Sequence, residues 1–445
     1  MTENQLPGHR FGFIGLEPGV LPRHVWVLLY AAFVSIGLAT FDAFATPYVL
    51  SENVGIPITE QGGVVGRLNV YTEIVLLMVF APFGVLSDRI GRRAVYAFGF
   101  CCLGLGYALF PYASTVTELA GIRVVYSLGL GAVTGMLATL LGDYAIPEHR
   151  GRMVGMTGVL NGLGVVTSAI FLARLPKVFV SMGYDDFTAG QYTLLIVAGL
   201  CVLSACVVGF GLKGSTAVAA ADRPTVRELF RSGYSAAVQN PRIAVAYASA
   251  FVARGDLVVV GTFLVLWGKV AAVESGMGTA AAIDAGRIPF IVAQSAALLW
   301  AIVAIFLIDR FHRMTALAGC MGLASFAYLM LIFVDNPLDR ANVPFFLLLG
   351  IGQISAFLGS TTLIGKEAPA AQRGSVIGMF SVAGALGILI TSGVGGQVFD
   401  AIDPRAPFIL LGIMNFVVLL AALIVRIRAP GPATPADASL APSRV

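Results

Sequence analysis

The sequence predicts an all-α membrane protein with twelve transmembrane helices, arranged as two parallel repeats of six. Three observations predict it. The chain is 58% hydrophobic and only 12% charged, its apolar residues gather in long runs, and motifs of the first half recur in the second. Soluble domains are about half apolar and about a quarter charged. A helix that crosses a bilayer needs about 20 apolar residues, and each run reaches that length.

The runs set the expected helices and the side of the termini. We expect crossings at 24–46, 62–86, 94–113, 118–142, 152–175, 190–211, 243–266, 287–308, 314–334, 343–364, 375–397 and 406–426. An even number of crossings places both termini on one side of the membrane. The first run is too long for the apolar part of a signal peptide and has no small-residue cleavage site, so we expect it to remain as the first helix.

The distribution of basic residues predicts the orientation. Of the 28 Lys and Arg residues, 19 lie between runs or in tails on the side of the termini, five lie on the other side, and four lie inside runs. Basic residues accumulate in cytoplasmic loops. The sequence therefore predicts a multi-pass protein of the cell (inner) membrane with both termini in the cytoplasm.

The polar stretches between runs divide the chain. We expect a six-helix half at 1–211, a cytoplasmic linker at 212–242, a second six-helix half at 243–428 and a tail at 429–445. Thr225 and Glu228 fit a capping box, which predicts a short surface helix over 226–238. The tail is rich in Pro, Ala and Ser and is predicted to be disordered.

The two halves repeat each other at four places. The segments 142–156 and 365–379 share Arg-Gly and Gly-Met at one register, and Asp42 corresponds to Asp256 as Arg67 does to Arg287. The stretch 84–93 also has a weaker counterpart at 309–313, which lacks the glycines and predicts a looser turn. Chance similarity among apolar runs is the alternative, but it does not explain matching charges. A site near the midplane between the halves follows.

The stretch 84–93 carries four ionisable residues and cannot lie in hydrocarbon. Its pattern, G-x-L-x-D-R-x-G-R-R, resembles the signature loop between the second and third helices of the major facilitator superfamily. The matching residues are Gly84, Leu86, Asp88, Arg89, Gly91, Arg92 and Arg93. An ordinary basic connector is the alternative, but it would need neither the glycines nor the acid. The resemblance implies a secondary transporter that works by alternating access, with a monomer as the default.

The resemblance also implies a gate on the cytoplasmic side. We expect Asp88 to lie against the positive N-terminal end of the helix that opens near Gly374. Arg89 and Arg92 are expected to pair with Asp143, which follows run four. The counterpart residues Asp309 and Arg310 are included in this predicted gate. Such pairs would close the cytoplasmic side and break when it opens.

Two other motifs of the family are incomplete. Arg123 begins a stretch that resembles R-x-x-x-G-x-G, but Ser127 stands where a glycine is usual. Run five resembles the antiporter signature, but Leu163 takes the place of its proline. This second departure weakens an exporter interpretation without excluding it.

Seven ionisable residues lie inside runs: Asp42, Arg67, Glu73, Arg123, Arg254, Asp256 and Arg287. Such groups are costly in a bilayer and normally face a cavity or a partner. The alternative is a structural ion pair or a side chain that reaches the interface, most plausibly for Arg67 and Arg287 near the outer ends. We expect Gly255 to permit a helix break that turns Arg254 and Asp256 toward one cavity. Pro47 is expected to end run one, and Pro289 to lie near the start of run eight.

These residues lead to the functional hypotheses. A carboxyl group that changes its surroundings as the cavity changes side can bind and release a proton. Asp256 is the first candidate for proton coupling, before Asp42 and Glu73. Four arginines against three acids favour a small organic solute that carries an anionic group. Alternatives are proton-driven efflux of amphiphilic drugs, a membrane-embedded sensor and a lipid-flipping protein. Efflux would use an aromatic lining, for which the candidates are Phe41, Phe44, Tyr48, Trp267 and Trp300.

Signals of other functions are missing from the sequence. It contains no G-x-x-x-x-G-K-[ST], no G-x-S-x-G and no H-E-x-x-H, and its five cysteines form no C-x-x-C pair. Its four histidines do not cluster, and no basic stripe is interleaved with aromatics. We therefore expect no enzymatic activity, no cofactor, no metal and no nucleic-acid partner. The expected partners are a solute, a proton or other coupling ion, and the lipid bilayer.

Overall fold

The computed structural model describes residues 9–214, 226–369 and 372–429. Within these residues, twelve helical stretches are long and apolar enough to cross a membrane, and each overlaps one of the predicted runs. The all-α membrane fold and its twelve crossings are therefore confirmed. The disordered tail predicted at 429–445 lies outside the described residues except for Ala429, and Thr225 of the expected capping box also lies outside them.

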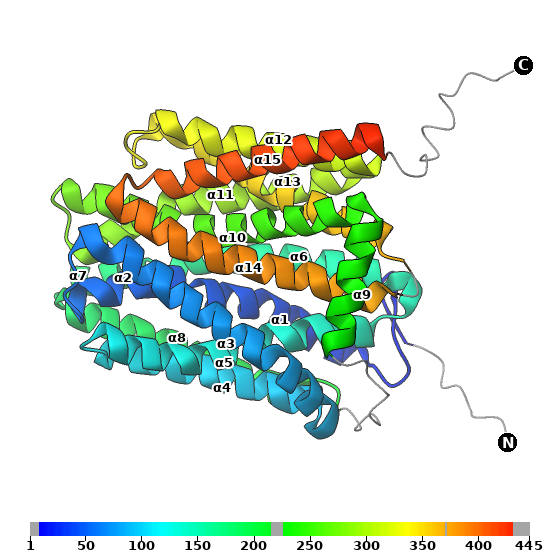
Figure 1. Ribbon diagram of the computed structural model, residues 1–445. Coiled ribbons are helices and arrows are strands. Elements are labelled where there is room, and N and C mark those ends of the chain that lie inside the picture. Colours follow the sequence, from blue (N-terminus) through cyan, green and yellow to red (C-terminus); the bar gives the residue numbers. More distant parts are fainter. Residues whose placement is uncertain (1–8, 215–225, 370–371, 430–445) are drawn as a thin grey trace, which may run out of the picture. The chain divides into compact units, whose positions relative to one another are not determined.

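The helices follow one another with short connections (Figure 1). The first half contains α1 (Pro22–Thr40), α2 (Asp42–Glu52), α3 (Gln61–Ile90), α4 (Arg92–Leu109), α5 (Val116–Tyr144), α6 (Arg150–Thr167), α7 (Leu175–Ser181) and α8 (Asp186–Gly211). The second contains α9 (Val226–Gln239), α10 (Pro241–Glu274), α11 (Thr279–Ile308), α12 (Arg313–Leu329), α13 (Val343–Glu367), α14 (Arg373–Ala401) and α15 (Ala406–Arg428).

Two smaller features lie outside the crossings. α9 covers the residues over which the linker sequence predicts a short helix, and it lies across the ends of α10 and α14 (Figure 1). A hairpin of β1 (Arg10–Phe11) and β2 (Ile14–Gly15) precedes α1 and was not predicted. It is held against the end of α5, where Leu16 forms a β-bridge with Ala145. The hairpin thus packs against the C-terminal end of α5.

The chain divides into two compact units that largely follow the two halves. Unit 1 comprises residues 1–58, 71–221 and 272–287, and unit 2 comprises 59–70, 222–271 and 288–445. The exceptions are the first turns of α3, which group with unit 2, and those of α11, which group with unit 1. α3 and α11 are the second crossings of their repeats. The same part of each repeat therefore groups with the other unit, as the internal symmetry of the sequence predicts.

Three expected helix breaks are wrong. The first crossing is interrupted at Phe41, and Pro47 lies inside α2. A proline ring crowds the carbonyl four residues before it, which places the disturbance upstream of the proline. Pro289 lies well inside α11, because that helix begins eight residues earlier than expected. α10 continues through Gly255 without a break.

Glycines allow close backbone approach between neighbouring helices. A Cβ built on Gly350 of α13 would collide with the carbonyl oxygen of Ala293 in α11. A Cβ on Gly387 of α14 would meet the carbonyl of Phe251 in α10 in the same way. Small residues permit such packing in membranes, where dispersion contacts rather than the hydrophobic effect hold helices together. These glycines therefore fix the spacing of helices in unit 2.

We predict that Gly350→Ala lowers the free energy of unfolding by about 1–3 kcal/mol, the usual cost of overpacking. The added methyl group cannot be accommodated unless α11 and α13 move apart. Thermal unfolding of the purified protein in detergent measures the effect. The matched control is Gly199→Ala in α8, where a Cβ meets no atom within 4 Å. Equal unfolding temperatures for the two variants would contradict the packing argument.

Candidate functional site

An ion pair inside unit 1 joins the first and fourth crossings. The Nη1 atom of Arg123 in α5 donates to the Asp42 carboxylate at the start of α2. The same nitrogen donates to the Thr46 hydroxyl at 2.8 Å, and Nε donates to the Thr72 hydroxyl of α3 at 3.0 Å. Thr46 in turn donates to Asp42 at 2.9 Å. Three helices are thus tied together by one guanidinium group.

This pair is sheltered from solvent and lipid. The Arg123 side chain is 2% exposed, and that of Asp42 is 13% exposed. The Arg123 guanidinium also lies 5.2 Å from the centre of the Tyr126 ring, within the range of a cation–π contact. A buried charge is tolerated when it is paired and hydrogen-bonded. Arg123 and Asp42 satisfy this condition together, and removal of either would leave the other charged in an apolar surrounding.

We predict that Arg123→Gln and Asp42→Asn each destabilise the protein by about 3–5 kcal/mol, the usual cost of an unpaired buried charge. The double variant should lose less than the sum of the two, because it leaves no lone charge. Thermal unfolding of the four proteins gives the coupling energy. Additive losses would show that the two side chains act independently.

The corresponding acid of unit 2 has different surroundings. Asp256 in α10 is 0% exposed. Both of its carboxylate oxygens accept from the Asn415 amide of α15, each at 3.1 Å. The Tyr328 hydroxyl of α12 donates to the backbone carbonyl of Asp256 at 3.4 Å. Among the described residues, no cation forms a salt bridge with this acid. Asp256 therefore lies in the core of unit 2 with a neutral partner.

Arg254 points away from Asp256, as two residues on a continuous helix must. Its guanidinium lies 5.6 Å from the centre of the Phe357 ring in α13. Its aliphatic part lies next to Gly384 in α14, where a Cβ would meet the Arg254 Cγ at 2.6 Å. Since Gly255 produces no break, Arg254 and Asp256 do not share one cavity, contrary to expectation.

The three remaining charged candidates are placed near the helix starts or along α3. Glu73 is buried in α3 within unit 1. Arg67 is exposed on the first turns of α3, which belong to unit 2. Arg287 donates to Asp284, one turn earlier in α11, at 2.7 Å. Asp284 also accepts from Lys177 of α7 at 2.7 Å. Arg287 is thus part of a three-residue ion network in unit 1.

The first turns of α3 and α11, which group with the unit of the other half, each contact an aspartate. In unit 2, the Asp400 carboxylate of α14 accepts from the backbone amides of Gly62 and Gly63, at 2.9 and 2.6 Å. In unit 1, the Asp186 carboxylate of α8 accepts from the Ala280 amide of α11 at 3.0 Å. Both contacts satisfy free amides at the positive end of a helix.

A buried amine lies beside the first of these contacts. The Lys269 ammonium of α10 is 0% exposed and donates to the Gln61 amide oxygen, the first residue of α3, at 2.9 Å. Asn69, two turns further along α3, donates to the Thr262 hydroxyl of α10 at 3.1 Å. The first turns of α3 are therefore fixed to α10 and α14 by polar contacts along their length.

Sequence reasoning did not single out Asp284, Lys269, Asp400 or Asn415 as site residues. Asp284, Lys269 and Asp400 fall outside the expected spans, because α10, α11 and α14 extend beyond the apolar runs that predict them. The spacing of Asp284 and Arg287 in a helix was a usable signal, since residues three apart lie on one face. Asn415 carries no charge, so the pattern of ionisable residues inside apolar runs does not indicate it.

The gate motif is helical rather than a loop. α3 continues to Ile90 and α4 begins at Arg92, so Gly91 alone forms the turn. Its φ of +94° is a conformation that favours glycine. Arg92 contacts the Asp143 carboxylate of α5, and it lies 3.9 Å from Asp88 in the last turn of α3. Gly84 and Arg89 also lie in α3, and Arg93 is the second residue of α4.

The counterpart in unit 2 has a four-residue turn between α11 and α12, looser than the single glycine. The first residue of α12, Arg313, donates to the Glu367 carboxylate at the end of α13 at 3.1 Å. Arg242 donates to the same carboxylate at 2.8 Å. In the turn itself, Asp309 accepts from Lys366 at 2.7 Å. Arg92 and Arg313 thus make equivalent ion pairs in the two halves, each from the first residue of a third crossing.

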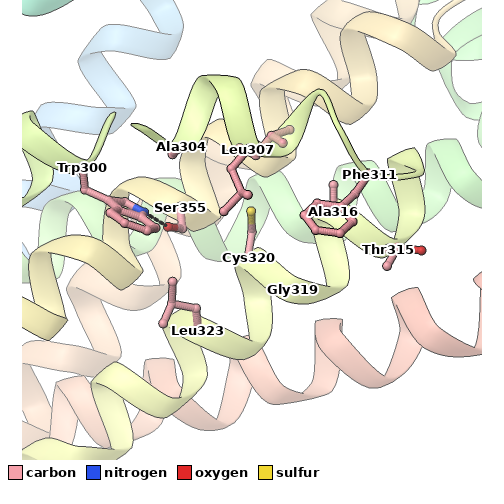
Figure 2. Close-up of a pocket in the computed structure, with 11 residues that line it drawn as sticks. Trp300, Ala304, Leu307, Phe311, Thr315, Ala316, Gly319, Cys320, Leu323 and Ser355 are labelled. Atoms are coloured by element: carbon pink, nitrogen blue, oxygen red, sulfur yellow. Dashed lines mark hydrogen bonds between the residues drawn. The ribbon is translucent and has the colours of Figure 1, made fainter. Parts of the chain in front are cut away.

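The aromatic candidates are mostly packing residues. Phe41, Phe44 and Tyr48 surround a cavity of only about 10 Å³ in unit 1. Trp267 is buried between Phe346 and Phe408, with ring centres 6.2 and 5.8 Å away. Trp300 differs, because it lines a larger groove between α11, α12 and α13 (Figure 2). In the described part of the chain, no group of three His, Cys, Asp or Glu side chains could hold a metal ion.

Comparison with known proteins agrees with this architecture. The sequence model of the Major Facilitator Superfamily matches residues 27–390 and 343–444. The chain belongs to this superfamily. A mutant of the nucleoside transporter NupG has a similar solved structure, with a TM-score of 0.71, 14% identity, and coverage of 90% of this chain and 99% of that one. At this identity, the likeness shows the superfamily's fold.

Relatives in sequence include magnetosome proteins and a transporter. Magnetosome protein MamH of Paramagnetospirillum magneticum is 31% identical over 85% of this chain and 86% of its own length. Magnetosome protein MamZ of the same organism is 28% identical over 89% of this chain, which spans only 62% of MamZ. The 4-hydroxybenzoate transporter PcaK of Pseudomonas aeruginosa is 28% identical over 44% of this chain and 41% of its own length.

Proposed function

We propose that this superfamily member is a proton-coupled secondary transporter for a small organic anion. It resides in the cell membrane with both termini in the cytoplasm and works as a monomer by alternating access of its two six-helix halves. The observation that carries the proposal is the difference between the two corresponding acids. Asp42 has an arginine partner, whereas the side chain of Asp256 accepts from the Asn415 amide and, among the described residues, forms no salt bridge.

The surroundings of Asp256 suit a proton carrier. An ionised carboxylate in a fully buried site without a cation is costly, and a bound proton removes that charge. Asn415 Oδ1 is buried and accepts no hydrogen bond among the described residues. A protonated Asp256 can donate to this oxygen while its second oxygen accepts from the amide nitrogen. Asn415 therefore provides hydrogen bonds for both protonation states.

The arginines and one relative support an anionic solute. Arg254 in α10 lies 5.6 Å from the centre of the Phe357 ring, and a guanidinium group forms charge-assisted hydrogen bonds with carboxylates. The relative PcaK is a 4-hydroxybenzoate transporter, and 4-hydroxybenzoate carries a carboxylate. Efflux of amphiphilic drugs has less support, because the aromatic candidates Phe41, Phe44 and Trp267 are packed within their units.

A ligand screen followed by transport tests the proposal. Purified protein is heated with benzoates, aliphatic organic acids, sugars and drug cations, and stabilisation by a ligand reports its concentration relative to its affinity. The stabilising compound, radiolabelled, is then offered to proteoliposomes with an imposed pH gradient. Accumulation of an organic acid that requires the gradient is the expected result. Stabilisation by drug cations alone would favour the efflux alternative.

We predict that Asp256→Asn abolishes accumulation driven by the pH gradient while it preserves exchange of labelled for unlabelled solute. The amide is nearly the same size as the acid but cannot carry a proton. Both activities are measured in the same proteoliposomes. Asp335→Asn, which changes an acid that is 94% exposed, is the matched control and should leave both activities intact. Accumulation by the Asp256 variant at the normal level would remove this residue from coupling.

We predict that Asp88→Ala slows transport more than it weakens solute binding. Asp88 lies beside Arg92 and Asp143, in a cluster of charges that belongs to the gate motif rather than to the core of the unit. Loss of one member should change the rate of conformational change. Initial transport rates and ligand-induced thermal shifts separate the two effects. Asp335→Ala, which changes an exposed acid outside the gate motif, is the control. An Asp88 variant with normal turnover but poor binding would refute the prediction.

A further inference from the structure

The groove lined by Trp300 runs along an exposed side of unit 2. α11, α12 and α13 form its walls, and its volume is about 290 Å³. Trp300 and Leu323 lie at one end, Phe311 and Thr315 lie at the other, and Leu307 and Cys320 lie between them (Figure 2). Eight residues separate Trp300 from Ile308 on α11, which corresponds to about 12 Å of helix. The groove is therefore narrow and elongated.

The polar groups in the groove are already bonded to the protein. The Trp300 indole N–H donates to the Ser355 hydroxyl at 2.8 Å, and that hydroxyl donates to the Ile351 carbonyl at 2.7 Å. The Thr315 hydroxyl accepts from Arg426 of α15 at 3.1 Å. A molecule bound in the groove would therefore contact an apolar surface that offers few free hydrogen-bonding groups. Hydrocarbon fits such a surface better than a polar solute does.

The outer wall of the groove is a helix face that lipid would cover. Its exposed side chains on α11 are Leu299, Ile302, Val303, Ile305, Phe306 and Leu307. In a membrane crossing, such a face meets acyl chains. An acyl chain can therefore enter the groove directly from the bilayer, with its end near Trp300 and its head near the turn at 309–312.

Positive charge collects at the polar end of the groove. The charged side chains of that end come from the turn at 309–312 and from α12, α13 and α15: Asp309, Arg310, Arg313, Lys366, Glu367, Arg426 and Arg428. Both acids form salt bridges, Asp309 with Lys366 and Glu367 with Arg313. No acidic side chain among the described residues pairs with Arg310, Arg426 or Arg428. The groove thus ends at uncompensated cations.

We propose that this groove binds an anionic phospholipid, with one acyl chain in the channel from Trp300 to Phe311 and the phosphate near Arg310 and Arg426. Arg426 holds Thr315 at the mouth of the groove, and Arg310 lies between the lining residues Ile308 and Phe311. Basic pockets between membrane helices suit anionic headgroups. The site belongs to unit 2 alone and is independent of the proposed transport function.

Quenching of Trp300 by brominated lipids tests the proposal. A single-tryptophan protein is made with Trp26→Phe and Trp267→Phe and is reconstituted in phosphatidylcholine vesicles. A fixed small fraction of either brominated phosphatidylglycerol or brominated phosphatidylcholine is then added. Bromine on an acyl chain quenches only when it lies next to the indole. Stronger quenching by phosphatidylglycerol at equal fraction is expected, and equal quenching by the two lipids, or none, would overturn the proposal.

Two substitutions locate the lipid, each with a matched control. Arg426→Gln should lower the preference for phosphatidylglycerol about fivefold, which corresponds to about 1 kcal/mol for one basic residue near a membrane surface. Arg340→Gln, which removes an exposed basic residue just before α13, at the end of that helix opposite Lys366, should leave the preference unchanged. An unchanged preference in Arg426→Gln, or an equal loss in both variants, would overturn the headgroup assignment.

The second substitution fills the groove itself. A Cβ on Gly319 meets no atom within 4 Å, so Gly319→Leu places a side chain in the channel without a clash. It should reduce quenching of Trp300 by both lipids. Gly199→Leu in α8, also at an open position, should not. Undiminished quenching in Gly319→Leu would show that a lipid chain is not the occupant. The same conclusion would follow if the protein with Gly319 were a dimer and the Gly319→Leu variant a monomer.

Discussion

The cost of charge in an apolar surrounding is the constraint on which the rest of this structure depends. The chain places several ionisable side chains inside its crossings, and the described ones are accommodated in different ways. Arg123 and Asp42 neutralise each other within a hydrogen-bonded cluster. Asp256 has no such partner, and its amide neighbour can bond either protonation state. This inequality between corresponding positions is what gives the two halves different chemical roles in the proposed transport cycle.

The second crossings of the two repeats, α3 and α11, are held at their starts by a second kind of contact. The starts of α3 and α11 are grouped with the unit opposite to the rest of their own half. An aspartate accepts from backbone amides near each start, Asp400 for α3 and Asp186 for α11. Helix N-termini bind carboxylates through free amides and the helix dipole, without need for a basic side chain. Contacts of this kind are individually modest, so the proposed conformational cycle could break and re-form them.

Sequence reasoning was most successful where a pattern reflects the membrane itself. The length of apolar runs follows bilayer thickness, and the repeated motifs at 142–156 and 365–379 follow an internal symmetry, so the twelve crossings and the surface helix α9 could be predicted. Precise helix ends could not. The break at Phe41 rather than Pro47, and the unbroken passage through Gly255, depend on how the neighbouring helices pack.

The sequence by itself determined the family, the number of crossings and the identity of the charged residues inside them, because each rests on composition, spacing or a local motif. Only the tertiary structure decided the partners of those charges. Asn415 meets Asp256 from a helix 159 residues away in sequence, and Arg123 meets Asp42 across 81 residues. Apolar runs look alike along the chain whichever helices they contact. The faces that meet are therefore fixed by glycine contacts such as Gly350 against Ala293, and these exist only once the helices are packed.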